Sequence, residues 1–148
     1  ASGGLGDVYK RQVLETLGVS MVGFKTSEFP SFYSRSSGIK RVTRVDSVKK
    51  ISEVFLNNRF LETLGATLVL NPTPAESEIP IEIMDPIIHS AIAKLNKRGI
   101  EGKMVTPFLL SYIHEKTEGR SLGANISLAL NNIQLGSKIA KSLNAKGG

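Results

Sequence analysis

The sequence predicts an α/β fold with largely parallel strands. Two short apolar runs, residues 19–24 and 67–70, have the length of buried strands, and segments with helical spacing separate them. The same five residues, Leu-Glu-Thr-Leu-Gly, stand directly before the first run and one residue before the second. Alternating helices and strands are typical of layered α/β structures. A length of 148 residues, 41% of them hydrophobic, suits one packed domain.

The first elements are a helix end, a strand, a loop and a second strand. Residues 14–18 predict the last turn of a helix, with Gly18 in the left-handed conformation that a Cβ would disfavour. A strand over residues 19–24 follows. Residues 28–38 contain Pro, Gly and several Ser, which favour a loop. Residues 41–45 alternate charged and apolar side chains, as a half-buried strand does.

A helix and a third strand come next. Ser47 is a good N-cap, and apolar residues follow it at helical spacing up to the second Leu-Glu-Thr-Leu-Gly. This repeated sequence predicts one local solution used twice, a helix, a glycine cap and a buried strand, rather than a repeat array. The strand over residues 67–70 stops at Asn71-Pro72-Thr73-Pro74, because proline has no N–H to donate to a sheet.

The remaining chain predicts three helices. The first opens at Pro80 or at the Asp85-Pro86 pair, since proline is tolerated in a first turn, and it reaches about Arg98 before Gly99 closes it.

Thr106-Pro107 predicts the N-cap and first residue of the second helix, which Gly119 ends. Ser121 then predicts the N-cap of the last helix, which runs to about Leu143.

Composition excludes several classes of protein. The chain has no cysteine, which rules out disulfides and thiolate metal sites, and no stretch approaches the ~20 apolar residues of a membrane-spanning helix. No signal peptide is visible. The net charge of +6 can attract phosphorylated molecules or nucleic acid. The basic residues are dispersed, however, and aromatic residues make up 6% with no Trp, so a solvated basic surface is the favoured interpretation.

Few side chains indicate chemistry by their pattern. His89 and His114 are isolated and lack ligand spacing, and no Gly-x-Ser-x-Gly elbow surrounds Ser36 or Ser37. An acidic cluster precedes or opens a helix, where the helix dipole favours carboxylates in any case. Its members are Glu76, Glu78, Glu82 and Asp85.

Three asparagines in the last helix are more informative. Asn125 and Asn132 are seven residues apart and share a face, and Asn131 is adjacent. Their amides can hold a sugar hydroxyl or a uracil edge. The alternative is that Asn125 assists capping while the other two bind neighbouring backbone, and the residues alone favour this alternative.

Residues 1–12 differ from the rest of the chain. Their glycines lack both a preceding strand and the Gly-Lys-Ser/Thr ending of a phosphate loop. They are predicted to be a tail or a junction, so the domain is assigned to residues 13–148.

Several motifs in one order resemble the pseudouridine-5′-phosphate glycosidases, a family also called indigoidine synthase A-like. The likeness covers residue 13 to about residue 143. It is carried by Glu28-Phe29-Pro30-Ser31-Phe32-Tyr33-Ser34-Arg35-Ser36-Ser37-Gly38, Arg44-Val45-Asp46-Ser47, Asn71-Pro72-Thr73-Pro74, Gly102-Lys103-Met104-Val105-Thr106-Pro107-Phe108-Leu109-Leu110, Gly119-Arg120-Ser121-Leu122-Gly123-Ala124-Asn125-Ile126 and Leu130-Asn131-Asn132.

The resemblance implies a reaction and an architecture. The family is described as reversibly cleaving the C–C glycosidic bond of pseudouridine 5′-phosphate to uracil and ribose 5-phosphate, through a Schiff base on a lysine that acts as an electron sink. Manganese bound to an aspartate, a homotrimer, a three-layer α/β/α fold and a cytoplasmic location are implied with it. Neither a membrane nor nucleic acid is expected as a partner.

Only one active-site position carries over. Asn125, in its Ser-Leu-x-x-Asn context, is expected to contact the substrate as a catalytic residue. The family's Ala-Gly-Ala-Lys-Ser segment has no counterpart, Lys10 is not in that context, and the metal-binding Asp is also missing. Arg35, Ser36 and Lys103 lie in family motifs without an assigned role.

The chain is therefore expected to be a C-terminal half that is inactive alone. A non-catalytic domain that binds a phosphometabolite or RNA is the alternative, and a hydrolase using Ser36 or a histidine is a third.

Overall fold

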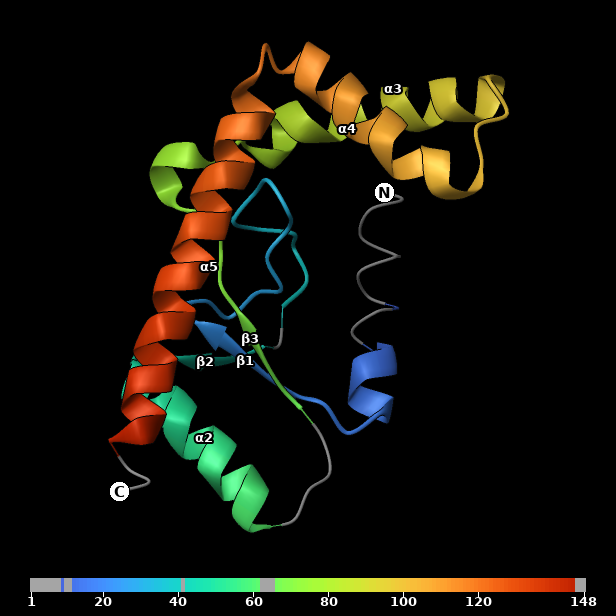
Figure 1. Ribbon diagram of the computed structural model, residues 1–148. Coiled ribbons are helices and arrows are strands. Elements are labelled where there is room, and N and C mark those ends of the chain that lie inside the picture. Colours follow the sequence, from blue (N-terminus) through green and yellow to red (C-terminus); the bar gives the residue numbers. More distant parts are fainter. Residues whose placement is uncertain (1–8, 10–11, 41, 62–65, 146–148) are drawn as a thin grey trace.

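The computed structural model describes residues 9, 12–40, 42–61 and 66–145 (Figure 1). A helical segment over residues 12–16 comes first. The labelled elements then follow in this order: β1 (Ser20–Phe24), β2 (Thr43–Val45), α2 (Val48–Phe60), β3 (Thr67–Leu70), the 3-10 turn η1 (Ala75–Ser77), α3 (Ile81–Lys97), the 3-10 turn η2 (Gly102–Met104), α4 (Val105–Lys116) and α5 (Arg120–Asn144).

The described strands form one parallel sheet in the order β2-β1-β3. Val22 in the central strand is level with Thr43 on one side and with Val69 on the other. The predicted α/β class with parallel pairing is confirmed. Strand β2 is shorter than predicted, because the Val42 N–H donates to the carbonyl of Ser27 in the preceding loop rather than to the sheet.

Helices α2 and α5 cover one face of this sheet. Val22, Val45, Ile51 and Leu135 are buried together from four different elements, and we call them the sheet cluster. Partly buried neighbours such as Phe24 and Ile139 extend it. In Figure 1 the helical segment before β1 lies on the opposite side of the sheet from α5. The strands therefore lie between helices, as layered α/β proteins require.

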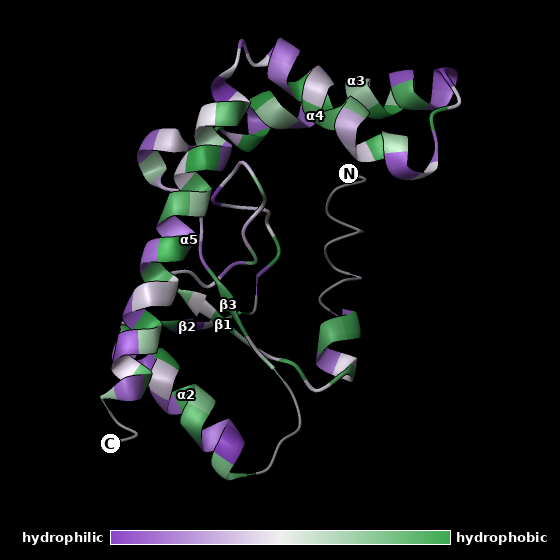
Figure 2. Cartoon of the chain, viewed as in Figure 1, coloured by the Kyte–Doolittle hydropathy of each residue, from purple (hydrophilic) through white to green (hydrophobic). Residues whose placement is uncertain are grey.

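A second cluster lies beyond the end of the sheet. It contains Tyr33, Ile79, Met84, Ile113 and Ala124, and we call it the loop cluster because its first two members belong to irregular segments. Helices α3 and α4 pack against each other and project away from the sheet (Figure 1). Met84 of α3, Ile113 of α4 and Ala124 of α5 are buried together in this cluster, and Figure 2 shows that residues coloured as hydrophobic occur on all three helices.

Most predicted helix ends are confirmed. Gly18 and Gly99 have φ of 71° and 59°, in the left-handed region where glycine is favoured. The hydroxyl of Ser47 accepts a hydrogen bond from the Lys50 N–H at 3.2 Å, as an N-cap does. The second Leu-Glu-Thr-Leu-Gly falls largely on residues 62–65, outside the described residues, as do most of residues 1–12.

Two predicted caps are wrong. Thr106 is not an N-cap, because η2 starts the coil one turn earlier and α4 begins at Val105. Ser121 lies inside the first turn of α5, where its N–H donates to the Thr117 hydroxyl at 3.1 Å. Pro80, and not Pro86, precedes the first residue of α3.

Within the described part of the chain, every helix falls short of the length or apolar character that a bilayer crossing needs.

Candidate functional site

The carboxyl ends of the three strands meet at one edge of the sheet, and the loops that follow them form the candidate site. Ligands of open α/β sheets bind at this edge, because loops from neighbouring strands can surround a molecule there. The loop over residues 25–42 follows β1, Asp46 and Ser47 follow β2, and residues 71–80 follow β3.

A groove of about 310 Å³ lies between these loops. Its lining carries three cationic side chains, three hydroxyl groups and one carboxylate. The lining residues are Lys25, Thr26, Ser27, Glu28, Arg35, Ser36, Arg44 and Pro72. The excess of basic groups makes the groove suited to an anion.

Lys25 is held in the groove by a strained turn. Its φ is 58°, which is uncommon for a residue with a side chain, and its N–H donates to the Val45 carbonyl at 2.8 Å. The turn is so tight that a Cβ at Gly23 would lie 2.3 Å from the carbonyl oxygen of Thr26. Strained residues are concentrated at functional sites, where they fix the position of a side chain before a ligand arrives.

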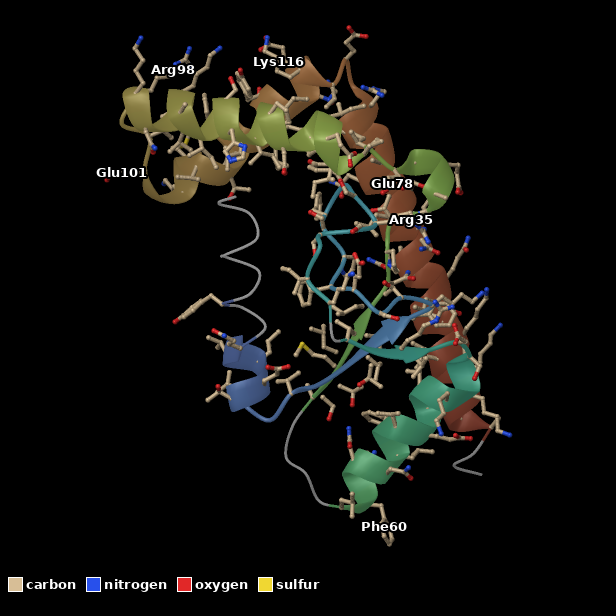
Figure 3. The ribbon with its side chains drawn as sticks, turned by 180° about the vertical axis from the view of Figure 1, so that it is seen from behind. Arg35, Phe60, Glu78, Arg98, Glu101 and Lys116 are labelled. Carbon is tan, nitrogen blue, oxygen red and sulfur yellow. The ribbon has the colours of Figure 1, made fainter. Side chains whose placement is uncertain are left out.

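Arg35 is anchored from two directions. Its backbone N–H donates to Oε1 of Glu78 at 2.8 Å, and its Nη1 donates to the Thr73 carbonyl at 2.7 Å. The Thr73 hydroxyl in turn donates to the Phe32 carbonyl at 3.1 Å. Figure 3 shows Arg35 and Glu78 close together. The loops after β1 and β3 are therefore joined by hydrogen bonds, and the guanidinium is positioned between them.

The other charges of the groove are partly matched. Nε of Arg44 donates to Asp46 at 2.8 Å, and both side chains are exposed. The Ser36 hydroxyl donates to the Glu28 carboxylate. Lys25 has its Nζ 5.3 Å from the centre of the Phe24 ring. Among the residues that the structure describes, neither Lys25 nor the Arg35 guanidinium contacts a carboxylate, so both charges are more available than that of Arg44.

Two of the three asparagines singled out from the sequence, Asn131 and Asn132 on α5, reach the edge of this groove. Nδ2 of Asn71 donates to Oδ1 of Asn132 at 2.9 Å, and Nδ2 of Asn131 donates to the Pro72 carbonyl at 3.3 Å. Asn131 binds a backbone carbonyl, as the alternative expected, although that carbonyl is 59 residues away, whereas Asn132 pairs with the side chain of Asn71 and not with backbone. The two amides tie α5 to the segment after β3.

Asn125 differs from these two. It is half-buried on α5, two turns before Asn132 on the same side of the helix. Among the described residues its amide has no hydrogen-bond partner, and it does not line the groove. The amide is therefore available for a group from outside these residues.

The remaining candidates are dispersed. His89 and His114 are exposed, and Nδ1 of His89 contacts the Asp85 carbonyl at 2.9 Å within α3. Lys103 lies in η2 at the tip of the α3–α4 pair, where the neighbouring Glu101 is far from Arg35 in Figure 3. The Ser37 hydroxyl donates to the Phe29 carbonyl and stiffens the loop.

Manganese favours carboxylate ligands. No three carboxylate or imidazole groups among the described residues gather in a way that would hold a metal ion. Within the acidic cluster, Glu78 accepts a hydrogen bond from the backbone N–H of Arg35, while Glu76, Glu82 and Asp85 are exposed. These residues do not fit a manganese site, so we derive no step through one.

Lys25 and Arg44 were not singled out from the sequence. The signal that identifies both is position: Lys25 directly follows β1, and Arg44 lies within β2, one residue before its carboxyl end. Motif spacing cannot reveal this, because the groove joins loops from three strands.

Comparison with known proteins adds to this geometry. The family model described as "Indigoidine synthase A like protein" matches residues 2–142. Pseudouridine-5′-phosphate glycosidase from Petrotoga mobilis is 45% identical over 134 residues, which are 90% of this chain and 44% of that protein. The glycosidase from Staphylococcus aureus is 41% identical over 133 residues, with 90% of this chain and 43% of that protein covered.

Two solved structures are similar in fold. An indigoidine synthase A-like protein from Thermotoga maritima aligns with a TM-score of 0.75 and 39% identity, over 91% of this chain and 44% of that one. The prealnumycin C-glycosynthase, in complex with ribulose 5-phosphate, aligns with a TM-score of 0.84 and 24% identity over the same shares. The chain spans less than half the length of these relatives.

Proposed function

Because the chain belongs to the indigoidine synthase A-like family, we propose that it forms one side of the active site of a pseudouridine-5′-phosphate glycosidase. The observation that carries the proposal is the 45% identity to such an enzyme over 90% of the chain. The proposed reaction is the reversible cleavage of the C–C glycosidic bond, giving uracil and ribose 5-phosphate.

The groove supports this substrate class. A phosphate monoester is a dianion that Arg and Lys side chains bind through charge-assisted hydrogen bonds. Arg35 is already oriented by Glu78 and Thr73, and Lys25 is fixed by its turn. We assign the 5′-phosphate end of the substrate to the groove near these two cations.

Asn125 has a separate role in the proposal. Its amide, which has no partner among the described residues, offers both a donor and an acceptor, which suits a ribose hydroxyl or the edge of uracil. Because Asn125 does not line the groove, the substrate would extend from the cations toward α5.

The chain alone is proposed to be inactive. The family resemblance implies a lysine that forms a Schiff base with the opened ribose, and it implies manganese, a homotrimer and a cytoplasmic location. The lysine segment of the family is absent from this sequence. We therefore propose that the electron sink is supplied by residues outside the matched region.

The test compares the chain with a restored enzyme. The chain is assayed for uracil release from pseudouridine 5′-phosphate with manganese, first alone and then fused to the remaining part of the Petrotoga mobilis glycosidase. We expect release only from the fusion. Release by the chain alone would show that one of its own lysines, with Lys10 the first to examine, forms the imine.

Asn125→Ala in the fusion is expected to lower kcat/KM by roughly 100-fold or more, the usual effect of removing one preorganised polar contact to a reacting substrate. Asn57→Ala, at an exposed asparagine of α2, is the matched control and should leave turnover unchanged. Equal turnover of both variants would remove Asn125 from the site. Substrate binding by a fusion that never releases uracil would favour the non-catalytic alternative.

A further inference from the structure

Helix α5 is apolar on two faces, of which the other described residues cover one. Its inner face contributes Ala124 and Leu135 to the two hydrophobic clusters. Its outer face carries four large aliphatic side chains that are more than half exposed, and we call them the α5 stripe. They are Leu122 (53%), Ile126 (54%), Leu130 (55%) and Ile133 (67%).

The stripe is continuous along the helix. Its members are separated by four, four and three residues, which places them within an arc of about 80° on a helix of 3.6 residues per turn. Ala124 and Leu135 lie on nearly the opposite side by the same geometry. A helix that is apolar on opposite faces is normally buried between two layers.

The charge pattern agrees with burial. Residues 121–137 contain no charged side chain, although 22% of the residues in the chain are charged. The centres of protein interfaces are depleted in charged residues, whereas solvated helix faces are rich in them. The absence of charge on an exposed helix therefore indicates contact with another polypeptide.

The position of α5 leaves this face accessible. In Figure 1 and in the reverse view of Figure 3, α5 forms one edge of the molecule, with the sheet on its inner side. In Figure 2 hydrophobic residues recur along the length of α5.

We propose that the α5 stripe is the docking surface for the remaining part of the family domain. The relatives hold more than half of their length outside the matched region, since the match covers 44% of the Petrotoga mobilis protein. That remaining polypeptide must pack against the matched part, and the stripe is an apolar surface of the required kind. The occupant is thus a folded segment with a complementary apolar face, and not a small ligand.

The stripe also adjoins the candidate site. Asn125 is three residues after Leu122 and lies about 60° from it around the helix. A polypeptide layer on the stripe would bring its own side chains next to the unpaired Asn125 amide. The inference rests on the proposed function in one respect, because it assumes that residues outside the described ones complete the site. Docking, however, can be measured without turnover.

The experiment mixes the 148-residue chain with the separately produced remaining part of the Petrotoga mobilis glycosidase. Sedimentation velocity then measures the complex. We expect a 1:1 complex, and we expect the double variant Ile126→Asp, Leu130→Asp to weaken it by roughly 100-fold or more, as hot-spot positions do. Because both side chains are exposed, the helix content by circular dichroism should be unchanged.

Phe60→Asp is the matched control. Phe60 is 87% exposed on α2 and projects into solvent in Figure 3, so this change should leave the affinity intact. Equal affinity of the stripe variant and the control, or no complex with the unmodified chain, would overturn the proposal. Loss of self-association in the stripe variant, without any effect on the complex, would assign the stripe to a second copy and would overturn it too.

Failure of the proposed function has a different signature. A stripe-dependent complex that releases no uracil would retain the docking surface and reject the glycosidase assignment. If the complex releases uracil and the stripe variant binds as tightly as the unmodified chain, the glycosidase assignment is retained and the docking surface is rejected.

Discussion

The sheet cluster and the loop cluster stabilise the molecule in different ways. The sheet cluster brings together aliphatic side chains from two strands and two helices, and Ile51 at its centre is only 1% exposed. The loop cluster places Tyr33 and Ile79, from two irregular segments, against three helices. Backbone and hydroxyl hydrogen bonds fix these two residues, with the Ser34 hydroxyl donating to the Ile79 carbonyl at 2.7 Å and the Ile79 N–H to the Tyr33 carbonyl at 3.0 Å.

The difference shows how each region depends on its sequence. Aliphatic side chains on regular elements tolerate exchange if the volume is kept, because the contacts have no direction. A buried hydrogen bond depends on particular atoms, and a group left without its partner is costly. The candidate groove is built on the second kind of support, through Ser34, Arg35 and Thr73.

The largest expected effect is in the sheet cluster. Ile51→Ala should lower the free energy of unfolding by about 2–5 kcal/mol, since it removes a fully buried side chain and leaves a cavity. Urea denaturation followed by circular dichroism measures the change. Phe60→Ala, at the exposed end of α2, should change stability by less than about 0.5 kcal/mol. Equal effects at the two positions would contradict the packing described for α2.

Ser34→Ala tests the hydrogen-bonded support of the loop cluster. Ser34 is 2% exposed, and its loss leaves the buried Ile79 carbonyl without that donor, so we expect a cost of about 1–3 kcal/mol. Ser36→Ala removes an exposed hydroxyl two residues away and should be nearly neutral. If the two alanine variants unfold at the same urea concentration, the Ser34 bond does not stabilise the loop.

Tyr33→Phe gives the smallest effect, and the effect depends on pH. Burial raises the pKa of Tyr33, so above pH ~10 the unfolded chain ionises first and the unmodified protein loses stability as pH rises toward the folded pKa. Between pH 8 and pH 10.5, the stability of Tyr33→Phe should therefore rise relative to that of the unmodified protein, by less than about 1 kcal/mol.

Tyr112 supplies the opposite case. The hydrogen bond with Ser90, followed by the charges of Lys94 and Lys116, lowers the pKa of Tyr112. Tyr112→Phe should therefore lose stability relative to the unmodified protein as pH rises.

The contrary outcome for Tyr33 is also clear. If the stability difference between Tyr33→Phe and the unmodified chain is the same at pH 8 and at pH 10.5, burial does not raise the pKa of Tyr33.

Local patterns in the sequence predict the parts that depend on neighbours along the chain. The strands at 19–24 and 67–70, the Ser47 cap and the glycine-terminated helix ends are confirmed because periodicity, capping and left-handed glycine are local properties. The two wrong caps arise where local signals compete. A 3-10 turn precedes Thr106, and the Thr117 hydroxyl satisfies the N–H of Ser121 from the preceding turn.

The site is less predictable because its contacts are distant in sequence. Arg35 and Thr73 are 38 residues apart, and Asn71 and Asn132 are 61 residues apart. No spacing rule links such pairs. Asn125 stays a prediction, which the family motif suggested and which fits an amide that has no partner among the residues the structure describes.

The strand order also determines when the sheet can assemble. Strand β1 is the first of the three to leave the ribosome, yet it lies in the centre, and its partners begin at Thr43 and Thr67. One edge of β1 can therefore pair only after Val45 has been synthesised, and the other only after Leu70, about fifty residues after Ser20. Such delayed, non-local pairing slows folding and exposes strand edges to other chains. During synthesis β1 thus carries an uncovered edge until β3 has been made.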